Sequence, residues 1–226
     1  MPEIIQDIIR KDLQSVYMSG VSFGLGLCLL ENEGYRLISL EEQAILRIQG
    51  GKDSLVSRLG NWTREGYIHV PESPDPDEKV DSFITKNSPF SNLEYAVSGN
   101  PSGEKPISEE LRRAALSDSC PLEDVIHIPT LELSKNRAAS YAFGKCAEEY
   151  GRFLHDSGVR STRINSFGRQ AFFWGLDVSS EIGGQRTEKL GAVRGIRYTD
   201  PGTLNMIMEL NKIGFLREMI PKKEMQ

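Results

Sequence analysis

The chain is poor in cysteine and histidine, and this scarcity argues against several classes of protein. Its 226 residues include three cysteines and three histidines. No two cysteines form a Cys-x-x-Cys pair, and the histidines do not have the spacing of zinc ligands. A chain of this length does not need a disulfide framework. We therefore expect no metal site, no resident cofactor and a location in the reducing cytoplasm.

Long apolar runs are also missing. The most apolar stretch, at residues 20–30, is shorter than the roughly twenty residues that a membrane-spanning helix needs. Acidic residues flank it, and no small-residue cleavage pattern follows it. With 38% hydrophobic residues, the chain still has enough apolar side chains to form a core. We expect a globular protein without a membrane partner, in which residues 20–30 are buried as a helix end or a strand.

Excess positive charge is absent as well. The net charge of −5 argues against a surface that binds nucleic acid over its whole area. It leaves room for one basic face, because electrostatic attraction depends on where the charges lie.

Hydrophobic periodicity predicts helices in the first 70 residues. Apolar residues at helical spacing predict a helix over 3–18. Ser39 and Glu42 have the spacing of a capping box, which predicts that a helix over about 40–49 starts there. A further helix is expected over about 54–65, and Tyr67–Val70 has the composition of a short strand.

The remaining residues divide into a connector and a second part. Prolines and acidic residues at 71–108 predict a connector or irregular insertion. Beyond it we expect helices at 108–116, 135–156 and 203–211 and strands within 122–133 and 159–165. The predicted fold class is therefore α+β, with a helical N-terminal part (1–70) containing a possible winged-helix-like hairpin, a proline-rich connector (71–108) and an α/β C-terminal part (109–226).

Two glycine pairs suggest functional sites. The segment Gly50-Gly51-Lys52-Asp53-Ser54 resembles the phosphate loop of the PP-loop ATP pyrophosphatases, although Gln49 stands where that family has serine. In that family the loop joins a strand to a helix, and backbone N–H groups bind a pyrophosphate. The resemblance implies an ATP-using enzyme. The capping box, however, favours a helix before the loop.

If residues 40–49 are helical, the same glycines connect two helices, as in a winged helix or helix-turn-helix. The second helix would then present polar side chains on the face opposite its apolar residues, which suits contacts with phosphates and base edges. A solvated helical hairpin without a ligand explains the pattern equally well. The candidate nucleic-acid contacts in this part are Lys52, Ser57, Arg58, Asn61 and Arg64.

The second pair, Gly183-Gly184, is followed by Gln185, and the tripeptide resembles the Gly-Gly-Gln of peptide-chain release factors. Basic residues outnumber acidic ones around it, so several phosphate contacts are expected there. The candidates are Arg163, Arg169, Arg186, Lys189, Arg194 and Arg197.

We therefore predict a non-catalytic nucleic-acid-binding protein. The alternatives are an ATP-using enzyme and a structural or assembly subunit without a small-ligand site. A protein partner or a homo-oligomer remains open, and no motif decides whether the protein is an enzyme.

Overall fold

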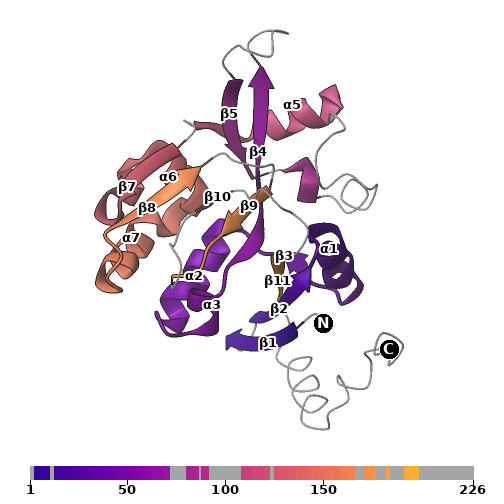
Figure 1. The fold of residues 1–226 in the computed structure, drawn as a ribbon, viewed down its shortest axis with the longest axis vertical. Coiled ribbons are helices and arrows are strands. Elements are labelled where there is room, and N and C mark those ends of the chain that lie inside the picture. The colour runs from indigo at the N-terminus through magenta and orange to yellow at the C-terminus, as the bar shows by residue number, and fades with distance from the viewer. Residues whose placement is uncertain are drawn as a thin grey trace.

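One mixed sheet joins the first and last strands that the structure describes (Figure 1). The computed structural model describes residues 3–10, 13–71, 80–86, 88–91, 108–122, 125–165, 170–176, 182–183 and 191–198. Its strands are β1 (Glu3–Arg10), β2 (Leu13–Val21), β3 (Arg36–Leu37), β4 (Asn61–Pro71), β5 (Val80–Thr85), β6 (Ser119–Leu122), β7 (Val125–Pro129), β8 (Ser161–Asn165), β9 (Gln170–Phe173), β10 (Ile182–Gly183) and β11 (Gly191–Tyr198).

The order along the sheet is β1-β2-β11-β4-β9-β10-β8-β7. Short β3 pairs with β11, and β5 pairs with both β4 and β6. The last described strand, β11, thus lies between β2, to which it is antiparallel, and β4, to which it is parallel. The division into 1–70, 71–108 and 109–226 stays a prediction.

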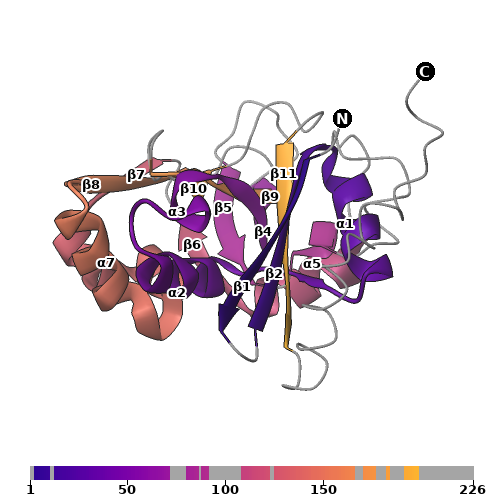
Figure 2. The same cartoon turned by 90° about the horizontal axis from the view of Figure 1, so that it is seen from below.

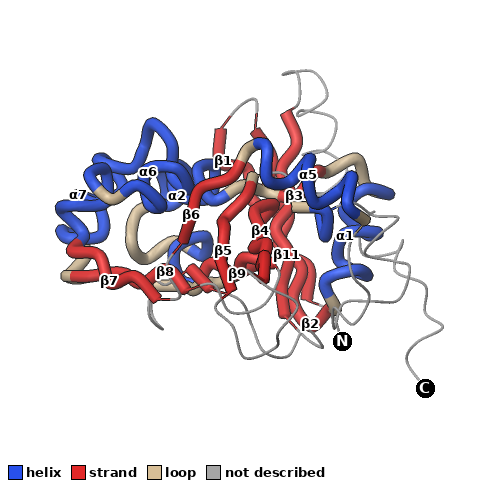
Figure 3. The backbone as a smooth tube through the Cα atoms, turned by 90° about the horizontal axis from the view of Figure 1, so that it is seen from above, coloured by secondary structure: helices blue, strands red, loops and turns tan. Residues whose placement is uncertain are grey.

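Helices lie on both sides of this sheet (Figures 2 and 3). Helices α2, α6 and α7 lie against the β9-β10-β8-β7 half, while α1 lies on the other side, against β2 and β11 (Figure 2). The helices are α1 (Phe23–Asn32), α2 (Leu40–Gly50), α3 (Leu55–Arg58), α5 (Glu109–Ser117), α6 (Arg137–Phe143) and α7 (Ala147–Asp156), with 3-10 turns η1 (Pro89–Ser91), η2 (Thr130–Lys135) and η3 (Gly144–Cys146).

The core has two main parts, and β9 contributes to both. Phe173 packs against Phe143 and Tyr150 under the α2, α6 and α7 layer. Its neighbour Phe172 packs edge-on against Trp62 on the α1 side. Successive strand residues point to opposite faces, so two adjacent phenylalanines anchor both layers.

The N-terminal helix prediction over 3–18 is wrong, because β1 and β2 form an antiparallel hairpin there. Residues Gln14 to Met18 are all buried, so β2 is covered on both faces. A strand covered on both faces shows no polar–apolar alternation, and runs of β-branched residues favour strands. The isoleucines at helical spacing in β1 therefore misled the periodicity argument.

The second predicted helix, over 54–65, is also wrong. Helix α3 has four residues, and the chain enters β4 at Asn61. Aromatic and β-branched residues such as Trp62, Thr63 and Ile68 favour this strand. The predicted winged-helix-like hairpin is consequently absent from this part of the structure.

Other sequence predictions are confirmed. The α+β class is correct, and α2 begins at the predicted capping box, in which Ser39 Oγ accepts from Glu42 N at 3.2 Å. Helix α5 has Ser108 as its N-cap.

The helix expected over 135–156 is interrupted at Gly144, which has a φ of +55°. The helix predicted over 203–211 lies outside the described residues.

Gly151 shows how closely α7 packs on η2. A Cβ built on this residue would lie 2.2 Å from the Thr130 carbonyl oxygen. We expect Gly151→Ala to destabilise the protein by about 2 kcal/mol, because overpacking outweighs alanine's higher helix propensity. Urea unfolding measures the change, and exposed Glu149→Ala on the same helix is the control. Equal stability of Gly151→Ala and the wild type would contradict this packing.

Candidate binding surface

A buried arginine connects four separate parts of the fold. Arg47, on α2, is completely buried. Its Nε donates to the Val56 carbonyl at 3.2 Å, its Nη1 to the Tyr150 hydroxyl at 3.0 Å and its Nη2 to the Trp174 carbonyl at 2.9 Å. The guanidinium also lies 3.8 Å from the centre of the Phe173 ring. Arg47 thereby fixes α3, α7 and the end of β9 relative to α2.

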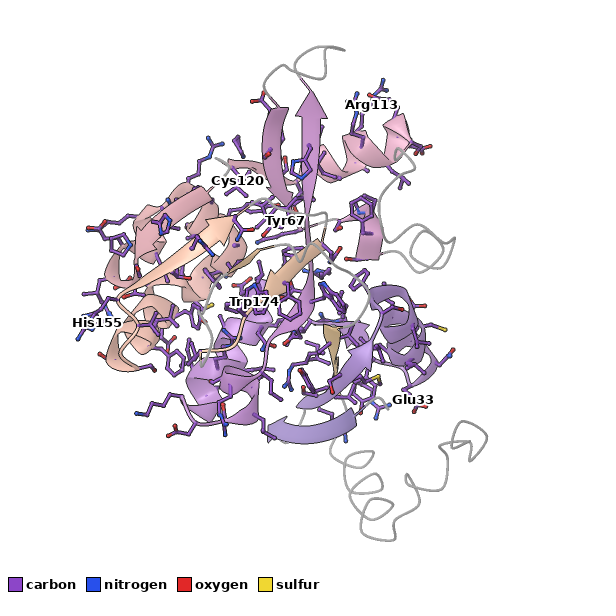
Figure 4. The ribbon with its side chains drawn as sticks, in the orientation of Figure 1. Glu33, Tyr67, Arg113, Cys120, His155 and Trp174 are labelled. Atoms are coloured by element: carbon purple, nitrogen blue, oxygen red, sulfur yellow. The ribbon has the colours of Figure 1, made fainter. Side chains whose placement is uncertain are left out.

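The segment Trp174–Leu176, just after β9, lies directly on α3. Leu176 N donates to the Ser57 carbonyl at 2.8 Å. A Cβ on Gly175 would lie 1.8 Å from the Arg58 carbonyl oxygen, so this close approach requires glycine. The Trp174 ring packs edge-on against Phe172, with 4.8 Å between ring centres. Figure 4 shows Trp174 in the middle of the molecule, above α2 and α3.

This backbone contact places the Trp174–Leu176 segment beside a helix that carries exposed side chains. Leu55 on α3 is 42% exposed, and Arg58 is exposed too. Trp174 and Leu176 are half-buried. We call Leu55, Arg58, Trp174 and Leu176 the α3 surface. Tryptophan and arginine are the residue types that contribute most to protein–protein binding, especially on a rigid base.

The residues predicted to face nucleic acid from a helix lie in different environments. Lys52 is exposed in the turn after α2, and Arg58 is exposed at the end of α3. Ser57 and Asn61 are completely buried. Arg64 is exposed, but on β4 rather than on a helix. No polar helix face is formed, because the chain turns into β4 after one helical turn.

In the predicted phosphate loop, side chains bond to a backbone carbonyl of the loop itself. Gly51 has a φ of +78° and ends α2. Its carbonyl oxygen accepts from the hydroxyls of Ser54 at 2.8 Å and Ser57 at 2.7 Å. Gly50 lies within α2, so a helix precedes the loop where the PP-loop pattern requires a strand; Lys52 and Asp53 are simply exposed turn residues. The phosphate-loop prediction is wrong.

The predicted basic surface near the second glycine pair is not assembled from the described arginines. Arg194 is completely buried and donates to Ser15 Oγ at 2.7 Å. Half-buried Arg197 donates to the Glu33 carbonyl and lies 4.4 Å from the Tyr35 ring centre. Arg163 is half-buried on β8. The other candidates lie outside the described residues: Arg169, Arg186 and Lys189, together with Gly184 and Gln185.

The sequence reasoning missed a buried carboxyl group. Glu65 is buried on β4, and its Oε2 accepts from Leu40 N at 2.9 Å, in the first turn of α2. Burial raises the pKa of this carboxyl to about 7. Burial also raises the pKa of the Tyr67 hydroxyl, and the nearby Glu65 charge adds to this effect. The only sequence signal is one acidic residue between the apolar Trp62 and Tyr67.

The described ranges contain neither a cluster of metal ligands nor a membrane-spanning helix. Within them, no group of three or more His, Cys, Asp or Glu side chains could hold a metal ion. No helix in the same ranges is both long enough and apolar enough to cross a bilayer.

Comparison with known proteins identifies the fold. No family model and no curated protein matches the sequence. One solved structure is similar, with a TM-score of 0.58, 14% sequence identity and coverage of 85% of this chain and 100% of the other. Its description reads "Accommodation of massive sequence variation in Nanoarchaeota by the C-type lectin fold". At this identity the likeness shows the fold alone.

The shared fold corrects the functional prediction. It is distinct from a winged helix, and neither the fold nor the positions of Ser57, Asn61 and Arg194 supports nucleic-acid binding. The prediction of a non-catalytic nucleic-acid-binding protein is therefore wrong, as is its alternative of a PP-loop enzyme.

Replacing Arg47 tests whether it holds the base of the α3 surface. Arg47→Met keeps much of the apolar volume but leaves the Val56 and Trp174 carbonyls and the Tyr150 hydroxyl without this donor. We expect a loss of about 3 kcal/mol in unfolding free energy, measured with urea. Exposed Arg152→Met on α7 is the matched control, with an expected change within about 0.5 kcal/mol. Similar stability of the two variants would contradict the role of Arg47.

Glu65 predicts a defined pH dependence. The folded-state pKa of about 7 exceeds the unfolded value of 4.5, so the folded state binds the proton more tightly. The contribution of Glu65 to the free energy of unfolding should be largest below pH 4.5. It should fall by about 3 kcal/mol as the pH rises to about 7. Glu65→Gln should remove this decline in urea unfolding between pH 5 and 8, whereas exposed Glu149→Gln should keep it. Identical pH profiles for wild type and Glu65→Gln would refute the prediction.

Proposed function

We propose that the protein binds another protein through the α3 surface. One observation carries the proposal: the backbone of the Trp174–Leu176 segment is fixed on α3, the short helix that exposes Leu55 and Arg58. A surface held in one conformation loses little entropy on binding. Its apolar and aromatic groups would be desolvated by a partner, while Arg58 supplies directional donors.

The fold supports this proposal in a second way. The similar structure is described as accommodating massive sequence variation by the C-type lectin fold. A fold can accommodate such variation when its stability depends on buried contacts rather than on its exposed residues. In this chain Arg47 provides those buried contacts directly beneath the α3 surface. The exposed residues above it are then available for binding.

A protein partner fits the α3 surface better than a nucleic acid does. Leu55 is one of three large hydrophobic residues exposed in the described part of the chain. An exposed leucine side chain has no donor to offer to a phosphate backbone. Protein interfaces, in contrast, combine an apolar centre with polar groups at the rim.

We also propose that the protein works in the reducing cytoplasm. Its three cysteines are free thiols, and Cys120 and Cys146 are buried as apolar core residues. Burial raises the pKa of the Cys146 thiol to about 12, which keeps it protonated. Neither of these two buried cysteines forms a disulfide.

Site-specific photocrosslinking tests the binding function. A photoreactive phenylalanine analogue at Leu55, expressed in the cell that makes the protein, should crosslink to a partner protein. The same analogue at exposed Arg152 on α7 is the control and should not give this product. The purified partner should bind the wild-type chain, and Arg58→Glu should weaken binding at least ten-fold, with urea unfolding used to verify that the variant is folded under the binding conditions.

Two outcomes would overturn the proposal. One is a partner whose affinity is the same for wild type, Arg58→Glu and Leu55→Asp. The other is the absence of any Leu55-specific crosslink together with saturable binding to a glycan on an array.

A further inference from the structure

Helix α1 is apolar on the face that points away from the sheet as well as on the face that packs against it. No charged side chain occurs from Phe23 to Leu30, and the buried residues of this stretch pack toward β2 and β11. On the opposite side Leu25 is 50% exposed, while Cys28 and Leu29 are half-buried. We call these three residues the outer face of α1, because their i, i+3, i+4 spacing places them together. Since a helix that is apolar all round is normally covered on every side, this face at the margin of the described fold (Figure 2) calls for a partner.

The last described strand ends next to this helix. β11 pairs with β3, the short strand that follows α1, with Ile196 opposite Arg36. One residue further along, Arg197 donates from Nη1 to the Glu33 carbonyl, at the C-terminal end of α1, at 3.0 Å. The chain therefore leaves the described sheet at Tyr198, beside the end of α1.

The sequence that follows Tyr198 supplies a turn and then apolar residues at helical spacing. Asp200-Pro201-Gly202 has the composition of a turn. Leu204, Ile207 and Met208 then have the spacing that predicts a helix over 203–211. The four residues 199–202 span up to about 13 Å when extended, and a helix is about 10 Å across, so this connection is long enough to reach the outer face of α1.

We propose that residues 203–211 form a helix that lies antiparallel on the outer face of α1. The direction follows from the starting point, because a helix that begins at the C-terminal end of α1 covers α1 only by running back toward Phe23. This arrangement places Ile207 and Met208 over Cys28 and Leu29. The segment is tethered to the sheet beside its docking site, so its effective concentration exceeds that of a second copy in solution. The inference does not involve the α3 surface.

Cys28 provides a native probe of this contact, because it lies on the outer face and the other two cysteines are buried. In a glutathione redox buffer, Met208→Cys should form a disulfide with Cys28 within one chain, detected as a monomer that has lost two titratable thiols. Met206→Cys, on the opposite side of the predicted helix, is the matched control and should form at least ten-fold less. Adding Cys28→Ser to Met208→Cys should abolish the product.

Alkylation of Cys28 tests the same contact without a new cysteine. Ile207→Asp should raise the rate at which iodoacetamide modifies Cys28 at least five-fold, because a carboxylate does not pack on an apolar face. Met206→Asp should leave this rate within two-fold of the wild-type value. Far-UV circular dichroism of each variant establishes that the fold is retained.

Three outcomes would overturn the proposal. Equal disulfide yields from Met206→Cys and Met208→Cys would show that no defined face of the segment meets α1. A Met208→Cys product that links two chains would show that a second copy covers the outer face. An alkylation rate that Ile207→Asp leaves unchanged would show that residues 203–211 do not protect Cys28.

Discussion

The buried guanidinium of Arg47 is the constraint on which the arrangement of the described elements depends. A buried cation is costly unless its donors are satisfied. Here two carbonyls, one phenol and the face of an aromatic ring surround it, and they come from α3, α7 and the end of β9. Each of these groups must lie within hydrogen-bonding distance of one planar side chain. Arg47 therefore specifies relative positions that apolar packing alone would leave less precisely defined.

The α3 surface depends on side chains, because Leu55, Arg58 and Trp174 provide its chemistry. Trp174 directly follows β9, the strand whose Phe172 and Phe173 pack into the two parts of the core. The position of the surface is therefore tied to the same strand that anchors both layers of the fold.

Local signals in the sequence predicted some elements and not others. The capping box at Ser39 and Glu42 correctly located α2, because capping depends on residues close together in the sequence. The β1–β2 hairpin was missed because β2 is buried on both faces, a property set by α1 and by elements distant in sequence. The binding surface was only partly predictable. The sequence indicates Arg58, but for a helix face that does not exist, whereas the approach of the Trp174–Leu176 segment to α3 arises from the fold alone.

Buried polar side chains occupy the places where the sheet is irregular. The β4–β9 pairing shifts register between Trp62 and Gly66, which leaves backbone groups without regular ladder partners. Gln170 fills this position: its amide donates to the carbonyls of Thr63 and Glu65 and to Ser91 Oγ, while its oxygen accepts from Ser88 Oγ. Glu65 bonds the start of α2 from the same irregular stretch. Such buried polar contacts help to specify the fold. The exposed residues of the α3 surface can therefore change in chemistry without changing the backbone that carries them.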